Sequence, residues 1–301
     1  MRMKKILITG INSYIGNSLI TWFENRGGYH IEAISVKNDA WKNKDLSEYD
    51  VIIHLAGIVH LQEKKKMWSL YSSINCDLTY AVAKKAKKDG VKHFVFMSTK
   101  GVYIPNTAHI TENTQTTPTK MYGKSKLAGE EKIKTLSDSE FKVSIVRAPT
   151  VYGEGCRGNF PRLVKISEKL HIFPRLPNAR SMLYIWNLCE FIYRIIDTPI
   201  QNMILYPQDK EYCGTMKMMT GLWQARGERY YLSKIMALGI KNLLKLKREG
   251  ILHTMFTDSV YDYKMSNYYN YEYCVYSFEE AMKKTVEHRL QKKLKGEKTH
   301  G

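Results

Sequence analysis

Cysteine is scarce in this sequence of 301 residues, which holds only five. The five are odd in number, lie far apart and include no Cys-x-x-Cys pair, so we expect no disulfide framework, no zinc knuckle and no other metal site. We interpret all of them as buried thiols. They are Cys76, Cys156, Cys189, Cys213 and Cys274.

Long hydrophobic runs are also missing. No window approaches the roughly 20 consecutive apolar residues that a membrane-spanning helix needs. The N-terminal segment is basic, but its apolar run at residues 6–8 is too short for the hydrophobic core of a signal peptide. We therefore expect a cytoplasmic protein without stable insertion in a membrane.

Acidic residues are few, because 29 Asp and Glu accompany 47 Lys and Arg, which gives a net charge of +18 and a pI near 9.5. This balance raises a nucleic acid, an anionic membrane or an anionic ligand as partner. A nucleic-acid binder would interleave aromatic residues with a basic groove. The lysines here instead form short runs, such as residues 84–88, and a basic end at 283–298. We interpret them as a solvated surface and expect no nucleic-acid partner. Residues 243–248 could touch an anionic membrane, but we expect a helix that faces the core.

What the sequence does contain is a regular alternation of apolar strands and amphipathic helices. Its composition, 44% apolar and 12% aromatic, excludes a disordered chain. Strands that alternate with helices predict an α/β fold with a Rossmann-type doubly wound parallel sheet. The strands are expected at residues 5–9, 31–35, 51–55, 93–98 and 142–146, and the helices at residues 15–25, 71–88 and 122–136.

The pattern becomes less regular after residue 150, where prolines and glycines separate short segments. One further helix is expected at residues 188–197, and Ser277 with Glu280 forms a capping box that predicts the start of a last helix. The expected boundaries are 1–150 for a dinucleotide-binding domain, about 180–205 for a segment that returns to it, 151–179 and 206–290 for a smaller mixed substrate-binding lobe, and 291–301 for a basic flexible tail.

The first expected strand is followed by Gly10, and Gly16 lies at the start of the first helix. Gly10 would allow a tight turn and Gly16 a close packing of helix on strand, so that backbone N–H groups face a pyrophosphate. Ser13 stands where a middle glycine is usual, and an ordinary strand-to-helix turn would show the same two glycines. The position after the first strand favours dinucleotide binding.

Tyr122 and Lys126 are four residues apart on an expected helix, and therefore share one face. A lysine ammonium and a cationic nicotinamide beside a tyrosine would favour its phenolate form. Ser98 and Thr99 end the fourth expected strand, and open parallel sheets bind ligands outside the carboxyl ends of their strands. A hydroxyl at this point is well placed to meet the tyrosine.

Together these motifs resemble the extended short-chain dehydrogenase/reductases, and among them the nucleotide-sugar epimerases and dehydratases, such as the UDP-glucose/UDP-galactose 4-epimerase-like enzymes of bacterial surface polysaccharide synthesis. The resemblance is dense over residues 4–200 and loose beyond. The segments that carry it are Thr9-Gly10 with Gly16, His54-Leu55-Ala56-Gly57, Asn75, Ser98-Thr99 with Val102-Tyr103, Tyr122 with Lys126, and Arg147-Ala148-Pro149 with Tyr152-Gly153.

The resemblance implies roles for the matching residues. Tyr122 would be the acid and base for a sugar hydroxyl, Lys126 would hold the nicotinamide ribose and lower the pKa of the tyrosine, and Thr99 would hydrogen-bond the same hydroxyl. Ser98 is a candidate substitute for Thr99. The implied dinucleotide contacts are Gly10, Asn12, Ser13, Tyr14, Ile15, Gly16, Ser35, Lys37, Leu55, Ala56, Gly57, Asn75, Tyr122 and Lys126. The implied substrate contacts are His60, Thr99, Asn159 and Arg180, the last two on the sugar-nucleotide diphosphate.

One departure from the family pattern narrows the expected reaction. Dehydratases of the family carry an Asp-Glu pair directly after the catalytic Thr, and here Lys100 and Gly101 stand there. Dehydration across C4 to C6 would lack its acid and base, so we do not expect it.

A second departure concerns the cofactor, which is NAD or NADP. Ser35 replaces the acidic residue that binds the NAD ribose, and Lys37 could meet a 2′-phosphate, which favours NADP. Asp39 or Asp45 could still serve NAD if the loop folds back.

These features predict an NAD(P)-dependent epimerase that transfers hydride at a ring carbon, most often C4, of a nucleotide-linked sugar, with UDP implied by the resemblance alone. An NADPH-dependent reductase of a nucleotide-linked 4-keto-sugar remains an alternative. A non-enzymatic dinucleotide-sensing regulator of the same fold is disfavoured, because it would lack Tyr122 and Lys126. A homodimer through helices of the dinucleotide-binding domain is a further expectation.

Overall fold

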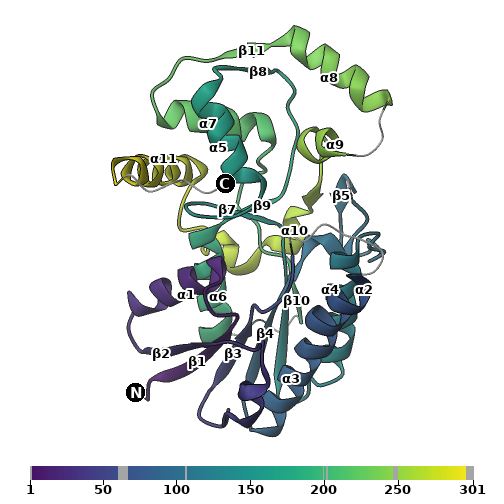
Figure 1. Cartoon of the computed structure of the whole chain (residues 1–301), viewed down its shortest axis with the longest axis vertical. Coiled ribbons are helices and arrows are strands. Elements are labelled where there is room, and N and C mark those ends of the chain that lie inside the picture. The colour runs from purple at the N-terminus through teal and green to yellow at the C-terminus, as the bar shows by residue number, and fades with distance from the viewer. Residues whose placement is uncertain are drawn as a thin grey trace. The chain divides into compact units, whose positions relative to one another are not determined.

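The computed structural model describes residues 2–59, 67–105, 107–198, 200, 203–246 and 250–295. It divides into two compact units (Figure 1). The first unit contains Met1–Pro105, Thr114–Pro149 and Leu188–Pro207, and the second contains Asn106–Asn113, Thr150–Asn187 and Gln208–Gly301.

A six-stranded parallel sheet forms the centre of the first unit, in the order β10-β6-β4-β3-β1-β2. The strands are β1 (Lys4–Thr9), β2 (Tyr29–Ile34), β3 (Val51–His54), β4 (His93–Thr99), β6 (Lys142–Ala148) and β10 (Ile204–Leu205). β2 and β3 lie on opposite sides of β1, so the topological switch point falls between β1 and β3, where folds of this type bind ligands. The expected doubly wound Rossmann-type sheet is confirmed.

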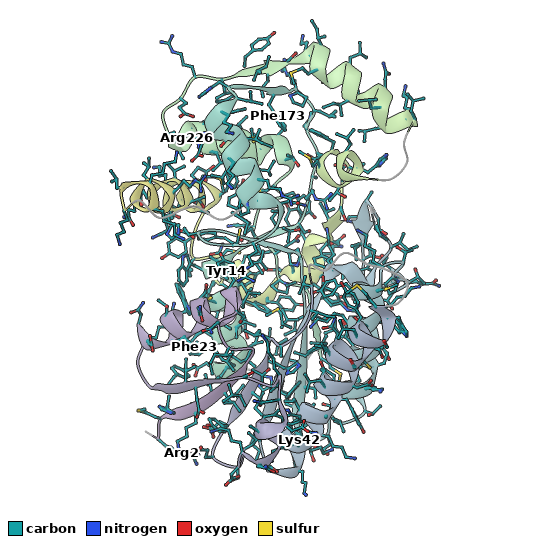
Figure 2. The ribbon with its side chains drawn as sticks, in the orientation of Figure 1. Arg2, Tyr14, Phe23, Lys42, Phe173 and Arg226 are labelled. Carbon is teal, nitrogen blue, oxygen red and sulfur yellow. The ribbon has the colours of Figure 1, made fainter. Side chains whose placement is uncertain are left out.

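Helices cover both faces of this sheet, as Figure 1 shows, with α1 and α6 on one face and α3 and α4 on the other. Their bounds are α1 (Tyr14–Glu24), α3 (Thr79–Lys88), α4 (Met121–Lys134) and α6 (Ile185–Asp197). The Glu190 carboxylate of α6 pairs with Arg26 at 2.6 Å and accepts a hydrogen bond from the Trp22 indole at 3.2 Å. Phe23 of α1, labelled in Figure 2, meets the Tyr29 ring edge-on at 5.0 Å. The sheet is therefore buried on both faces, which explains the nearly continuous apolar runs of its strands.

The helix expected at residues 71–88 is divided into three parts. α2 (Trp68–Ser72) leads into a π-helical turn, η3 (Ser73–Leu78), before α3 begins. A π-helical turn changes the direction in which the following side chains point, and such turns are frequent at functional sites. This turn holds the buried Asn75.

In the described part of the second unit there are three small parallel sheets of two strands each. The pairs are β5 (His109–Ile110) with β12 (Val260–Tyr261), β7 (Thr150–Tyr152) with β9 (Met182–Tyr184), and β8 (Ile172–Pro174) with β11 (Tyr231–Ser233). The helices are α5 (Asn159–Lys169), α7 (Thr215–Ala225), α8 (Lys234–Leu246), α9 (Ile251–Phe256), α10 (Tyr263–Ser266) and α11 (Phe278–Leu294). Phe173, labelled in Figure 2, is buried in a core cluster with Met219, Trp223 and Phe256. The Ser277 capping box is present at the start of α11.

The helix expected to face the core at residues 243–248 does so only in part over its described residues, because Leu244 packs on the core cluster while Leu243 and Leu246 are exposed. Two other expectations differ from the structure. Cys274 is only partly buried, unlike the other four cysteines. α11 continues to Leu294, so residues 291–294 of the expected flexible tail are helical. Within the described residues, no helix is long and apolar enough to cross a membrane.

Candidate active site

The turn between β1 and α1 lies against the loop that follows β3. Gly10 and Asn12 both have left-handed backbone conformations, with φ of 103° and 61°. A Cβ at Gly10 would lie only 3.1 Å from the backbone nitrogen of Ala56. Glycine therefore allows both the turn and the close approach, and it brings the carboxyl ends of β1 and β3 together at the switch point.

Ser13, which replaces the middle glycine, is the N-cap of α1. Its side-chain oxygen accepts a hydrogen bond from the Gly16 N–H at 3.1 Å, and a Cβ at Gly16 would lie 2.6 Å from that oxygen. The first turn of α1, which begins at Tyr14 (Figure 2), carries no acidic side chain. A helix N-terminus of this kind favours an anion. The turn between Gly10 and Gly16, together with the N-terminus of α1, forms a glycine cradle that a side chain at either glycine would fill. This cradle fits the pyrophosphate of a dinucleotide.

Asn75 holds the loop after β3 in place. Its Oδ1 accepts from the Ile58 N–H at 2.9 Å, and its Nδ2 donates to the Ile58 carbonyl and to the Ser125 hydroxyl, both at 3.0 Å. A Cβ at Gly57 would lie 2.8 Å from Asn75 Oδ1 and 3.3 Å from Lys126 Nζ. Asn75 therefore shapes this part of the crevice by positioning the loop.

The structure brings Tyr122, Lys126 and Thr99 together at the carboxyl end of β4. The half-buried Tyr122 phenol is hydrogen-bonded to the Thr99 side chain, whose oxygen also accepts from the Gly101 N–H at 3.0 Å. Lys126 is buried, and its ammonium donates to the Met97 carbonyl at 2.9 Å. These three groups lie on α4 and β4, as the spacing of the motifs predicts.

Burial controls the protonation of both residues on α4. It raises the pKa of Tyr122 to about 12, although the hydrogen bond with Thr99 acts in the opposite direction. It lowers the pKa of Lys126 to about 8, although the Glu130 carboxylate raises it. In the chain without a bound dinucleotide, the effect of burial is larger than any lowering, so the expected lowering of the Tyr122 pKa is not seen. At neutral pH the phenol is protonated and the lysine is mostly charged.

Replacing Lys126 by methionine is expected to remove part of the pH dependence of stability. The pKa of this lysine is about 8 in the fold against an ordinary value of 10.5, so between these values the unfolded chain binds more protons than the folded chain. Below pH 8 the folded chain bears the full free-energy cost of burying the charged ammonium. This cost disappears as the pH rises and the buried lysine loses its proton. Relative to Lys126→Met, the wild type should gain about 2 kcal/mol of unfolding free energy between about pH 7.5 and about pH 9.5. Urea unfolding at a series of pH values measures this gain.

Lys124→Met is the matched control, because Lys124 is an exposed lysine of the same helix. That variant should keep the slope of the wild type. A wild type and a Lys126→Met variant with equal slopes would contradict the lowered pKa.

Ser98, the candidate substitute for Thr99, meets a different residue of α4. Its hydroxyl is buried and donates to the Glu130 carboxylate, which also pairs with Arg147 at 2.6 Å. Arg147 in turn donates to the Tyr103 hydroxyl at 2.9 Å. Sequence reasoning missed this network, although Glu130 follows Lys126 by four residues, which is the same helical spacing that links Lys126 to Tyr122.

His54 is another buried residue whose role sequence reasoning missed: it connects two strands and a helix by hydrogen bonds. Its Nδ1 lies 2.7 Å from the Thr9 hydroxyl and its Nε2 lies 3.1 Å from the Thr79 hydroxyl. Burial lowers the pKa of His54 to about 3, so the imidazole is neutral. The imidazole connects β3 to β1 and to α3, and it has no exposed surface.

The end of β2 carries no carboxylate that turns back to the crevice. The Ser35 hydroxyl accepts from the Lys37 N–H at 3.3 Å, and the Lys37 side chain is exposed. Asp39 pairs with Lys42 at 2.8 Å, and Asp45 accepts from the Ser47 N–H at 2.9 Å. Both aspartates are therefore engaged with near neighbours in the chain.

The implied substrate contacts Asn159 and Arg180 belong to the second unit. Asn159 is exposed at the start of α5, directly after Gly158. Arg180 donates to the Thr257 carbonyl at 3.1 Å, and burial lowers its pKa, although Asp258 acts in the opposite direction. His60 lies outside the described residues.

Replacing Gly123 by alanine is expected to disturb the start of α4. A Cβ at Gly123 would lie 2.1 Å from the Gly101 carbonyl oxygen, so the helix would have to move away from the turn η4 (Lys100–Val102). Such overpacking costs roughly 1–3 kcal/mol of unfolding free energy. Thermal unfolding measures the loss.

Gly239→Ala is the matched control, because Gly239 is also helical and a Cβ there would meet nothing within 4 Å. This variant should gain roughly 0.5–1 kcal/mol from helix propensity. If the two alanine variants had the same stability, the close approach of α4 to η4 would be refuted.

Known proteins resemble this chain in sequence. The family model described as NAD dependent epimerase/dehydratase matches residues 6–203. The UDP-glucose 4-epimerase of Vibrio cholerae is 28% identical over 249 residues, which cover 73% of this chain and 75% of that protein. The UDP-2-acetamido-2,6-beta-L-arabino-hexul-4-ose reductase of Pseudomonas aeruginosa is 26% identical over 216 residues, covering 69% of this chain and 54% of that protein.

The fold of this chain is also found among solved structures. The UDP-N-acetylglucosamine 4-epimerase from Bacillus cereus superposes with a TM-score of 0.75 at 18% identity, covering 96% of this chain and 99% of that chain. The match of the family model over most of the sheet unit, together with the glycine turn and the Tyr122 and Lys126 pair, shows that this chain belongs to the NAD dependent epimerase/dehydratase family.

Proposed function

We propose that this chain is an NAD(P)-dependent epimerase that transfers hydride at a ring carbon, C4, of a UDP-linked sugar. The observation that carries the proposal is the arrangement at the end of β4, where Thr99 is hydrogen-bonded to the Tyr122 phenol and Lys126 is buried one helical turn further along α4. A glycine cradle for a dinucleotide lies in the same unit.

Each residue of the arrangement has a part in this proposal. A bound dinucleotide supplies the acceptor and donor of hydride. Tyr122 gives and takes the proton of the sugar hydroxyl, and Thr99 orients that hydroxyl. Lys126 remains mostly charged at neutral pH, so it favours the phenolate when the proton is transferred and holds ribose hydroxyls with its remaining N–H groups.

The residues after Thr99 argue against a dehydratase. Gly101 lies beside the tyrosine, since a Cβ there would be 3.9 Å from Tyr122 Cδ1. Glycine at this position supplies no carboxylate, and the neighbouring Lys100 is basic. The acid and base that dehydration needs are therefore missing at this turn.

The substrate class rests on the relatives. Two of the proteins described above are 4-epimerases of UDP-sugars by name. Arg180 and Asn159 are the residues that we propose for the diphosphate, and His60 for the sugar. A partly buried guanidinium suits a diphosphate, because it stays charged and forms paired hydrogen bonds.

A reductase of a nucleotide-linked 4-keto-sugar is the second candidate, favoured by the end of β2. The exposed Lys37 suits the 2′-phosphate of NADP, and both nearby aspartates are engaged elsewhere. The Pseudomonas aeruginosa relative carries the name of a 4-keto-sugar reductase.

Mass spectrometry of the purified native chain, followed by a panel of nucleotide sugars, tests the proposal. Retained NAD and interconversion of two UDP-sugars without net consumption of cofactor are expected for the epimerase. Uptake of NADPH and its stoichiometric oxidation by a 4-keto-sugar would favour the reductase. Failure to bind either dinucleotide would overturn both.

A further inference from the structure

Helix α8 of the second unit carries apolar side chains on two opposite faces. Ala237, Ile240 and Leu244 face inward and pack on the core cluster around Phe173 and Trp223. The outward side is apolar as well, although it packs on no core. Its exposed side chains are Ile235 (85%), Met236 (40%), Leu238 (62%), Leu243 (46%) and Leu246 (80%).

Exposed apolar residues also lie on the two strands that accompany α8 in the second unit. Tyr231 and Ile172, which are register partners of β11 and β8, are both exposed, and Leu170 just before β8 is exposed as well. Figure 1 shows β8, β11 and α8 together in the second unit. We call the outward side of α8 together with these three residues the α8 face. Exposed apolar patches of this kind mark interaction sites.

Basic residues border the α8 face. Lys234, Lys241 and Lys245 are spaced by seven and four residues, so they form one row along the flank of the helix, between its inward and outward sides. All three are exposed. The stretch 229–248 contains six Lys and Arg and no Asp or Glu.

We propose that the α8 face docks on the surface of an anionic phospholipid bilayer, with α8 parallel to the membrane plane. An apolar side flanked by lysines is the pattern of a helix that lies in the interface, with its apolar side chains among the acyl chains and its ammonium groups at the headgroups. Charge complementarity favours this partner over a second copy of the chain, because residues 229–248 of a second copy offer no Asp or Glu to pair with the lysine row. The proposal does not depend on the sugar chemistry.

Flotation of the full chain with vesicles tests the proposal. One set of vesicles contains equal parts of phosphatidylglycerol and phosphatidylcholine, and the other contains phosphatidylcholine alone. We expect binding to the first set that weakens with added salt, and little binding to the second.

Two double variants of the α8 face, each with a matched control elsewhere on the chain, distinguish binding by this face from non-specific effects of net charge and of exposed apolar side chains. Lys241→Glu with Lys245→Glu should lower the vesicle partition coefficient about tenfold or more. Lys84→Glu with Lys88→Glu on α3 makes the same change of charge at the same spacing and should leave most of the binding. Ile235→Gln with Leu246→Gln should also abolish most binding, whereas Leu290→Gln with Leu294→Gln, at exposed positions of α11, should not.

Circular dichroism and dinucleotide binding on every variant show that the fold and the cofactor site are intact, so a loss of vesicle binding is assigned to the surface. The proposal is overturned if the wild type does not float with anionic vesicles, or if the control variants lose binding as fully as the α8 variants. It is also overturned if light scattering finds a dimer that only Ile235→Gln with Leu246→Gln dissociates, because the face would then join two copies.

Discussion

Replacing Tyr122 by phenylalanine is expected to lower kcat by about three orders of magnitude while the fold remains. The change removes one hydroxyl from a half-buried ring and leaves the packing of α4 in place. General acid and base catalysis by a positioned group contributes about 10²–10⁴-fold to a rate. Burial raises the pKa of this phenol to about 12 in the chain alone, so the charged Lys126 and a cationic nicotinamide would have to lower it before the phenolate takes the sugar hydroxyl proton; the phenol formed then returns a proton to the sugar alkoxide.

Steady-state kinetics with the sugar nucleotide that the panel identifies measures kcat and KM separately. We expect kcat to fall while the dinucleotide affinity stays unchanged. The missing hydroxyl takes part only in the transition state of proton transfer, not in binding of the dinucleotide. Tyr80→Phe is the matched control, since this tyrosine lies on α3 with its ring beneath the Lys132 ammonium at 5.9 Å and keeps that contact. Undiminished turnover of Tyr122→Phe would sink the proposed role of the phenol.

Replacing Glu130 by alanine is expected to cost about 3–5 kcal/mol of unfolding free energy. Its carboxylate is fully buried and accepts from Arg147 at 2.6 and 3.1 Å and from the Ser98 hydroxyl. Although burial acts against the charge of Arg147, Glu130 raises the pKa of the guanidinium further above its ordinary value. The alanine variant would leave that charge buried without its partner, which is the costly situation.

The double variant Glu130→Leu with Arg147→Met should recover much of this loss, because it removes both charges and refills the space. Urea unfolding of the three proteins measures the differences. Glu48→Gln is the surface control, since Glu48 pairs with Lys5 at 2.7 Å in a largely exposed position, and it should change stability little. A double variant less stable than Glu130→Ala would be evidence that packing at this site outweighs the ion pair.

Sequence reasoning found those parts of the site whose residues lie close together in the sequence. The glycine turn at Gly10 and Gly16 comes directly after a strand, and Tyr122 and Lys126 are one helical turn apart. Both signals depend on residues that are near in the chain. The local backbone geometry of a turn or a helix therefore fixes where these side chains lie relative to one another.

The parts that it missed depend on partners far apart in the chain. Thr9 and His54 meet across neighbouring strands, and Glu130 meets Arg147 between a helix and a strand. Ser98 and Thr99 are adjacent in the sequence, but they meet residues that lie eight positions apart on α4. Ser98 meets Glu130, while Thr99, the last residue of β4, meets Tyr122.

By itself, the sequence determined the alternation of strands and helices, and hence the doubly wound sheet, because apolar periodicity is a local property. Only the tertiary structure decided which groups are buried, and burial sets the pKa directions of Tyr122, Lys126 and His54. It also decided which apolar side of α8 is exposed, since a helix with apolar residues on both sides does not reveal which one packs on the core.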